Sequence, residues 1–168
     1  MLAVGFIGHS GVGKTTLMEK VLARLVSRGR SVSVIKSSHH TVDIDTPGKD
    51  TYRYRTAGAQ EVMLVTSKRW ALMKELEEPG NLSDMLAVLD PVDIVLVEGY
   101  KSAEGIPRII VHRKDCEQSE LQFVPGVVAV ATDDETLVVP EGITKLDLNS
   151  PGAVANFVVT LKADNDLL

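Results

Sequence analysis

The sequence predicts an α/β protein in three layers, with a mostly parallel sheet and helices on both faces. An apolar strand runs through a glycine-rich turn into an amphipathic helix, a second short strand of β-branched residues follows, and later apolar runs have the length of buried strands. A strand, helix and strand in this order form a right-handed crossover between parallel strands. We therefore expect one domain over residues 1–168.

Length and composition exclude several classes of protein. The 168 residues, 44% of them hydrophobic, are enough for one well-buried core. A net charge of -5 argues against general affinity for nucleic acid or an anionic membrane. The single cysteine, Cys116, permits no internal disulfide, so we expect a reducing, cytoplasmic location. No apolar run approaches the roughly 18 residues of a membrane span, and the apolar start is expected to be a core strand rather than a signal peptide.

Helical and strand periodicities predict the elements of the first half. Leu17, Val21 and Leu25 recur at helical spacing after the glycine-rich turn, and Gly29 closes that helix. The other expected elements are strands over 2–7 and 31–36, a polar functional loop over 37–48, a helix over 50–57, and strands over 61–67 and 70–74 joined by a hairpin turn at 68–69.

The second half of the sequence is also expected to alternate between strands and helices. Asn81 or Ser83 is expected to cap a helix over 81–89, and Ser150 followed by Pro151 opens the last helix. The apolar stripe of that last helix consists of Val154, Phe157, Val158 and Leu161. Strands are expected over 94–97, where a continuous apolar run indicates burial on both faces, and over 108–112, 127–131 and 145–148.

The glycine-rich turn fits the pattern G-x-x-x-x-G-K-[ST] between a strand and a helix, which is typical of the phosphate-binding loop of P-loop NTPases. Its glycines allow backbone N–H groups to point inward, a lysine reaches the outer phosphates, and a threonine hydroxyl can bind Mg²⁺. The residues expected to hold the phosphates are Gly8, His9, Ser10, Gly11, Val12, Gly13, Lys14, Thr15 and Thr16.

A carboxylate is needed to complete the magnesium site. Glu98 follows the apolar strand over 94–97, so it lies at the carboxyl end of that strand, and Gly99 leaves room for phosphates. Asp45 or Asp50, in or just after the polar loop, is expected to supply a second carboxylate when that loop orders over the nucleotide. Lys36 ends a strand predicted to lie in the same sheet. It is either a second cation, beside Lys14, that stabilises charge on the transferred phosphoryl group, or a solvated strand end.

Charge is spread unevenly along the chain. Residues 49–74 contain six Lys or Arg and two acidic residues, whereas residues 75–98 contain seven acidic residues and no Lys or Arg. The basic stretch is either a site for a second anionic ligand or acidic partner, with Arg55 as a candidate contact, or a solvated face. Trp70, the only tryptophan, is expected in the core.

Recognition of the base is less clearly encoded, because the guanine signature N-K-x-D is absent. Asp133 follows the strand over 127–131 and could accept hydrogen bonds from guanine N1 and N2. Asp133 is equally well explained as a turn residue in the polar run over 132–135.

Several motifs together resemble the molybdopterin-guanine dinucleotide biosynthesis protein B family (MobB) along essentially the whole chain. They are the loop over 8–16, V-I-K over 34–36 with His39-His40, D-T-P-G-K-D over 45–50, R-T-A-G-A over 55–59, R-W-A-L-M over 69–73 and L-V-E-G-Y-K over 96–101. The resemblance implies a P-loop fold, GTP and Mg²⁺ binding with weak hydrolysis, and a homodimer. It also implies an adapter role beside the molybdenum cofactor guanylyltransferase, the enzyme that attaches GMP to molybdopterin.

The loop is also similar to that of dethiobiotin synthetases, a resemblance that implies active roles for Lys36, Asp50 and Glu98. An ATP-dependent small-molecule kinase or ligase that phosphorylates an anionic acceptor is therefore the alternative to the GTP-binding adapter. A third possibility is a binding module without catalysis.

Overall fold

A computed structural model describes residues 1–38, 42–116 and 121–161 and contains two compact units. The larger unit combines residues 1–37 with the chain from residue 81 onward, and the smaller unit is formed by residues 38–80. The sequence shows no internal repeat, low-complexity tract or long linker, so a division into two units was not expected. The smaller unit is an insertion after the second strand of the larger one.

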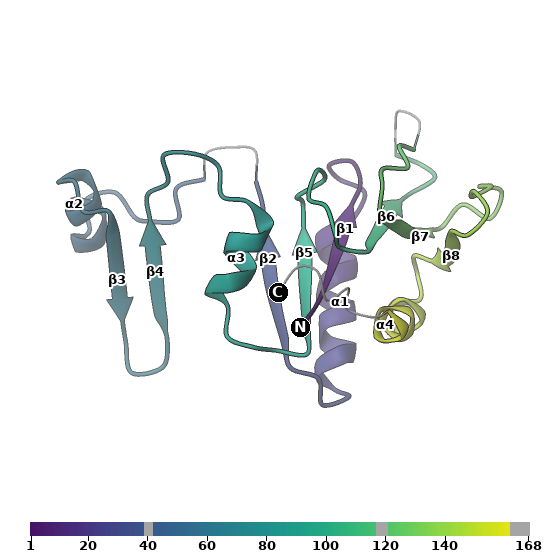
Figure 1. Ribbon diagram of the computed structural model, residues 1–168, viewed down its shortest axis with the longest axis horizontal. Helices are drawn as coiled ribbons and strands as arrows, with labels where there is room; N and C mark the ends of the chain where they lie inside the picture. Colours follow the sequence, from purple (N-terminus) through teal and green to yellow (C-terminus); the bar gives the residue numbers. More distant parts are fainter. Residues whose placement is uncertain (39–41, 117–120, 162–168) are drawn as a thin grey trace. The chain divides into compact units, whose positions relative to one another are not determined.

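The larger unit is built on a six-stranded sheet in the order β2-β5-β1-β6-β7-β8, in which every pairing is parallel (Figure 1). This confirms the predicted α/β class. The strands are β1 (Leu2–Ile7), β2 (Val32–Lys36), β5 (Ile94–Glu98), β6 (Arg108–His112), β7 (Val127–Thr132) and β8 (Thr144–Asp147). The helices of this unit are α1 (Lys14–Val26), α3 (Leu82–Val88) and α4 (Pro151–Thr160).

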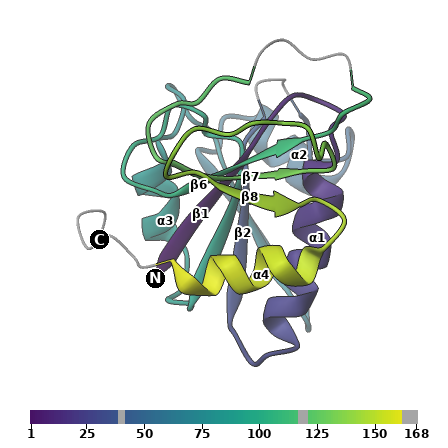
Figure 2. The ribbon, with the colours of Figure 1, turned by 90° about the vertical axis from the view of Figure 1, so that its right-hand side faces the viewer.

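Helices cover both faces of this sheet, as predicted. Phe6 and Val21 belong to a buried cluster in which α1 and α4 pack on one face. Leu86 of α3 packs with Val95 and Val97 in a second cluster on the other face. Figure 2 shows α1 and α3 on opposite sides of the strands. All four residues Ile94, Val95, Leu96 and Val97 are buried, which confirms a strand covered on both faces.

Helix ends agree with the capping signals. Asn81 caps α3, because its side chain accepts a hydrogen bond from the Asp84 backbone N–H at 2.9 Å. Ser150 is the N-cap of α4 with Pro151 as the first helical residue, but the serine side chain makes no capping hydrogen bond. Gly29 follows α1 with a φ of 77°, the left-handed conformation expected of a residue that closes a helix.

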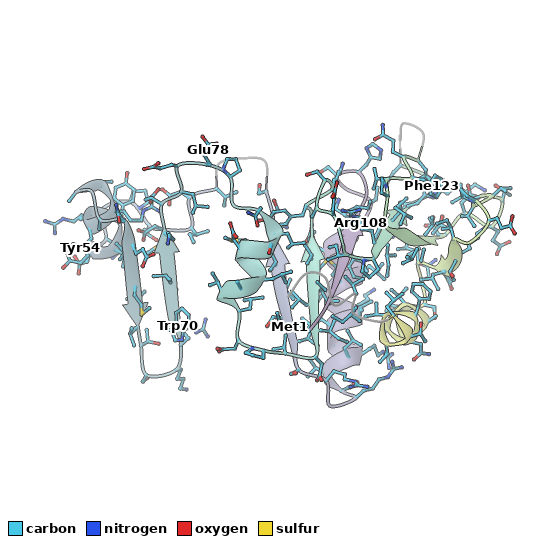
Figure 3. All side chains as sticks on the ribbon, in the orientation of Figure 1. Met1, Tyr54, Trp70, Glu78, Arg108 and Phe123 are labelled. Carbon is cyan, nitrogen blue, oxygen red and sulfur yellow. The ribbon has the colours of Figure 1, made fainter. Side chains whose placement is uncertain are left out.

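The smaller unit contains α2 (Asp50–Thr56) and an antiparallel hairpin of β3 (Glu61–Val65) and β4 (Trp70–Lys74). Val65 pairs with Trp70, and the Thr66 backbone N–H donates to the Arg69 carbonyl at 2.9 Å, which confirms the predicted hairpin. The prediction of a core tryptophan was wrong: the Trp70 side chain projects from β4 and 61% of the residue is exposed (Figure 3). The hairpin has only two strands, so it offers little interior in which to bury an indole.

None of the helices within the described ranges has the length and apolar character needed to cross a membrane.

The start of β2 is joined to the loop before β5 by a reciprocal contact. The Asp93 carboxylate accepts hydrogen bonds from the Ser31 backbone N–H at 2.8 Å and from its hydroxyl at 2.9 Å, and the Asp93 N–H donates to Ser31 Oγ at 2.9 Å. The bonds that Ser31 donates are the main reason why the pKa of Asp93 lies below its ordinary value. The charged carboxylate is therefore favoured by the folded state.

We expect this contact to make stability depend on pH. A depressed pKa contributes stability above the ordinary aspartate pKa of about 3.9, and that contribution is lost as the pH falls through the folded-state value. Asp93→Asn should lower the melting temperature at pH 7, and the difference from the wild type should shrink toward pH 3. Asp90→Asn, at an exposed neighbour, is the control. Thermal melts with a difference that stays constant with pH would contradict this linkage.

Candidate phosphate-binding site

The loop between β1 and α1 has the backbone conformation of an anion-binding turn. Gly8, Gly11 and Gly13 have φ angles of 149°, 81° and 92°. A Cβ at Gly8 would lie 2.4 Å from the Val111 carbonyl oxygen, so only glycine fits against β6. Gly13 is the N-cap of α1 and has a left-handed conformation. The predicted strand, loop and helix therefore follow one another as expected.

The loop leads into the amino end of α1. The first N–H groups of a helix have no acceptor within the helix, and its dipole favours an anion at this end. The first turn of α1 contains no acidic residue that would satisfy them. Thr15 and Thr16 are both exposed at this position. The arrangement suits a phosphate group.

Lys14 bends back over the loop. Its ammonium donates to the carbonyl oxygens of Gly8 at 3.1 Å and His9 at 2.6 Å. Partial burial lowers the pKa of Lys14, Glu98 opposes that shift, and the charges of Lys101 and Lys36 add to it. The charges of Lys36 and Lys101 thus reach Lys14 near the loop, and together these lysines raise the local positive potential in a chain of negative net charge.

Glu98 lies beside the loop, as predicted. The Thr15 hydroxyl is 3.1 Å from Glu98 Oε1 and 3.0 Å from Oε2, and it donates to this carboxylate. Strand register explains the contact, because Glu98 on β5 is paired with Phe6 on one side and with Lys36 on the other. The Lys36 ammonium is 3.6 Å from Glu98 Oε2, while the Glu98 side chain is only 13% exposed. Thr15, Lys36 and Glu98 therefore meet at the carboxyl ends of three adjacent strands.

The two residues after Glu98 have an unusual backbone. Gly99 has a φ of 98°, and a Cβ there would lie 3.0 Å from the Ser37 carbonyl oxygen. Tyr100 has a φ of 49° and, among the described residues, is the one residue other than glycine with a positive φ. Strained backbone of this kind is concentrated at functional sites, where the surroundings enforce it. The end of β5 therefore lies close to the residue after β2.

Two residues near the loop were missed by sequence reasoning. Lys101 lines a small cavity with Gly8 and His9, and it belongs to the L-V-E-G-Y-K motif, which was the available signal. Arg113 lines another cavity beside Gly13, on the side where Asn149 lies. Its signal was its position directly after β6, since carboxyl ends of parallel strands converge at one edge of the sheet.

Asp133 lies near Arg113. Its Oδ2 accepts from Arg113 Nη1 at 3.1 Å, and its Oδ1 accepts from the Lys114 backbone N–H at 2.8 Å. Both carboxylate oxygens therefore have a protein donor. The role of Asp133 in base recognition stays a prediction, and guanine would have to share or displace these donors.

The predicted second carboxylate belongs to the smaller unit, whereas the loop belongs to the larger unit. Asp45 accepts hydrogen bonds from the Thr46 N–H at 3.0 Å and the Thr51 hydroxyl at 2.8 Å. The Asp50 side chain is 86% exposed, with Arg53 4.0 Å away. Asp45 thus organises its own turn, whereas Asp50 is the more accessible carboxylate. His39 and His40 lie outside the described residues.

The basic stretch is partly neutralised within the smaller unit. Arg55 lies 3.5 Å from Asp43, 4.0 Å from Asp45 and 3.2 Å from Glu75, with only 20% of its side chain exposed. The Lys74 ammonium lies 2.8 Å from Glu61. Arg55 therefore has an internal structural role, which makes it a poor probe of partner binding.

An all-parallel α/β sheet, a glycine-rich loop between β1 and α1, and a carboxylate at the end of the neighbouring strand define a protein of the P-loop NTPase-like class. Residues 3–133 match the sequence profile of the family described as molybdopterin guanine dinucleotide synthesis protein B, MobB. The chain belongs to this family.

Individual relatives support the assignment. The chain is 40% identical over 162 residues to the molybdopterin-guanine dinucleotide biosynthesis adapter protein of Haemophilus influenzae, covering 92% of this chain and 86% of that protein. It is 38% identical to the protein of the same name from Escherichia coli, covering 93% and 90% of the two chains.

Solved structures agree with the fold. A crystal structure of a MobB homologue from Bacillus stearothermophilus is 27% identical and superposes with a TM-score of 0.71, covering 95% of this chain and 97% of that one. A crystal structure of Bacillus subtilis MobB, at 23% identity, gives a TM-score of 0.77 over 98% of this chain and all of that one. The second comparison supports the fold alone.

Proposed function

We propose that this protein is a GTP-binding adapter in the biosynthesis of molybdopterin guanine dinucleotide, acting in the cytoplasm beside the guanylyltransferase. Family membership supports the pathway, since the relatives carry the name adapter protein. The observation that carries the nucleotide proposal is the contact between Thr15 and Glu98 beside a glycine-rich loop. These two side chains have the chemistry that a metal-bound triphosphate requires.

Mg²⁺ is part of this proposal. It prefers octahedral oxygen ligands at about 2.0–2.1 Å, so adjacent ligand oxygens are about 2.9 Å apart. Thr15 Oγ1 lies 3.0 and 3.1 Å from the Glu98 oxygens, which fits adjacent ligand positions. Asp50 is the further carboxylate that we predict. Within the described ranges no three His, Cys, Asp or Glu side chains group into a metal site, so the other ligands would come from nucleotide and water. When bound, the ion supplies positive charge to the outer phosphates.

Turnover is expected to be slow. Lys14 and Lys36 can stabilise negative charge on the transferred phosphoryl group, because both lie next to the loop or to Glu98. Fast P-loop GTPases also need a residue that orients the attacking water and an arginine finger. The sequence and the geometry of the described residues assign neither. A GTP-dependent change in partner binding therefore describes the role better than rapid hydrolysis.

A titration with Mg·GTP and Mg·ATP, followed by phosphate release with and without the guanylyltransferase, tests the nucleotide proposal. We expect tighter binding of GTP and slow phosphate release. Tighter binding of ATP, or transfer of phosphate to a small acceptor, would favour the kinase or ligase instead. The absence of any binding by either nucleotide would contradict both.

A homodimer formed through the hairpin is also proposed. Apolar side chains are exposed on both faces of the hairpin, including Met63, Leu64, Val65 and Trp70. A two-stranded hairpin is marginally stable in water by itself, and exposed apolar patches mark interaction surfaces. A second copy of the chain would cover these side chains.

We expect Val65→Lys to weaken the dimer by about tenfold or more, because burying an unpaired ammonium in an apolar interface is unfavourable. Sedimentation analysis over a range of protein concentrations measures the change. Val138→Lys is the matched control, since Val138 is 88% exposed in the larger unit. Equal effects of the two substitutions, or a wild-type monomer at all concentrations, would contradict the proposal.

The guanylyltransferase and molybdopterin are the partners that we propose for the adapter. Lys49, Lys68 and Arg69 are exposed cations in the smaller unit, and they are better placed than Arg55 to meet an acidic surface or a phosphate group. Their combined replacement by glutamine should weaken capture of the guanylyltransferase while GTP affinity stays unchanged.

A further inference from the structure

Arg108 is a buried cation away from the phosphate-binding loop. It is the first residue of β6 and is 3% exposed, in the interior of the larger unit (Figure 3). Across the sheet it is paired with Gly5 of β1 and Val127 of β7. A fully buried arginine is rare unless it is paired with an anion. No carboxylate of the described residues lies within ion-pair distance of it.

The hydrogen bonds of Arg108 are incomplete. Nη1 donates to the Pro125 carbonyl oxygen, whereas Nε is buried and has no partner in the described part of the chain. Burial lowers the pKa of Arg108, and the Glu104 carboxylate acts in the opposite sense. A guanidinium keeps its charge in proteins, so the protein holds a desolvated cation with an unused donor.

The space around this side chain is provided by glycines. A Cβ at Gly5 would lie 3.2 Å from Arg108 Cγ, and a Cβ at Gly126 would lie 3.0 Å from Nη1. Gly126 also has a φ of 82°, which side chains rarely adopt. Both positions keep the backbone clear of the guanidinium.

Arg108 lines a cavity of about 660 Å³. This volume is within the range of roughly 300–1,000 Å³ that is typical of small-molecule sites. Its apolar walls come from the segment before β6, from the start of β7 and from the residue after α4, and they include Ile106, Pro107, Val128 and Leu161. Its polar groups are Lys101, Ser102, Glu104 and Arg108. None of residues 8–16, the phosphate-binding loop, lines it.

We propose that this cavity binds a small organic oxyanion, a carboxylate or phosphate monoester with an apolar body, through Arg108. The anion accepts a hydrogen bond from the Arg108 guanidinium and neutralises the buried charge, while the apolar body packs against Ile106 and Val128. Lys101 lines both this cavity and the smaller one beside Gly8 and His9, so a ligand here would lie next to the nucleotide site without using it.

Phenyl phosphate and benzoate are suitable probes, and benzyl alcohol is the uncharged control. Titrations are made with the Lys14→Ala chain, in which the phosphate-binding loop is weakened, and are followed by the Arg108 Nε–H resonance in ¹H–¹⁵N spectra. We expect saturable shifts with a dissociation constant of about 1 mM or below for an anion, and a value at least tenfold higher for the alcohol. A preference between the two anions distinguishes phosphate from carboxylate ligands.

Variants then test whether the anion binds in this cavity. Val128→Trp fills the cavity without touching the charge, and it should raise the dissociation constant at least tenfold, as should Arg108→Gln. Val138→Trp, at an exposed position outside the cavity, should leave it unchanged. If neither anion binds up to about 10 mM, if benzyl alcohol binds as well as the anions, or if Val128→Trp has no effect, the proposal is wrong. In those cases Arg108 only holds the Pro125 segment in place.

Discussion

Lys14→Ala is expected to raise the dissociation constant for Mg·GTP by roughly 30- to 700-fold, which corresponds to about 2–4 kcal/mol. The lysine ammonium lies against the loop, 2.6 Å from the His9 carbonyl oxygen, and it is the cation nearest to where the outer phosphates would bind. Truncation removes a charge-assisted hydrogen bond to an anion that has lost part of its water shell. Titration of a fluorescent GTP analogue measures the loss.

The control variant must remove one positive charge far from the glycine-rich loop. Arg28→Ala serves, because Arg28 is exposed just after the far end of α1, and a helix of 13 residues is about 20 Å long. Lys14→Arg asks whether charge alone is sufficient at this position. An affinity that is unchanged in Lys14→Ala, with native stability retained, would show that the glycine-rich loop does not bind the triphosphate.

The larger unit was predictable because local patterns and burial agree there. β1, the loop and α1 each have their own signal, and the continuous apolar run of β5 identified a central strand before any pairing was known. In a parallel sheet the carboxyl ends of the strands lie at one edge. Because Glu98 follows the apolar run of β5, it was predicted at the same edge as the glycine-rich loop. The contact between Thr15 and Glu98 then follows from strand order.

The smaller unit was less predictable, although its secondary structure was read correctly. Trp70 was assigned to a core because large aromatic side chains are usually covered, but whether a covering layer exists depends on tertiary or quaternary structure. Arg55 looked like one of several surface cations. Its contacts with Asp43 and Glu75 join residues from three segments, and no local pattern encodes such a cluster.

Arg108 and Lys101 show a different limit of prediction from sequence. A basic residue at the start of an apolar strand is normally interpreted as a strand end exposed to solvent. The hydrophobic pattern of the sequence is the same whether that side chain is exposed or buried. What buries Arg108 is the path of the residues around Pro125 and Gly126, which periodicity does not specify. Chemistry that depends on irregular segments is therefore found from coordinates and not from sequence patterns.

Glu98→Gln is expected to change GTP affinity in opposite directions with and without Mg²⁺. The substitution keeps the size of the side chain and an oxygen acceptor for the Thr15 hydroxyl, but it removes the negative charge that would face the proposed divalent ion. With Mg²⁺ we expect the dissociation constant for GTP to rise about 10- to 100-fold and phosphate release to be lost. With a chelator, binding should tighten, because a carboxylate no longer repels the phosphates.

This change of sign separates a metal role from a structural one. If Glu98 only held β2, β5 and the loop together through Thr15 and Lys36, Glu98→Gln would weaken binding equally in both conditions. Glu141→Gln, at an exposed residue before β8, controls for loss of one negative charge and should alter neither affinity. Thr15→Ala removes the second proposed metal ligand, so its effect should also require Mg²⁺. In the double variant the two losses should fall short of additivity, because residues that hold one ion act as a unit.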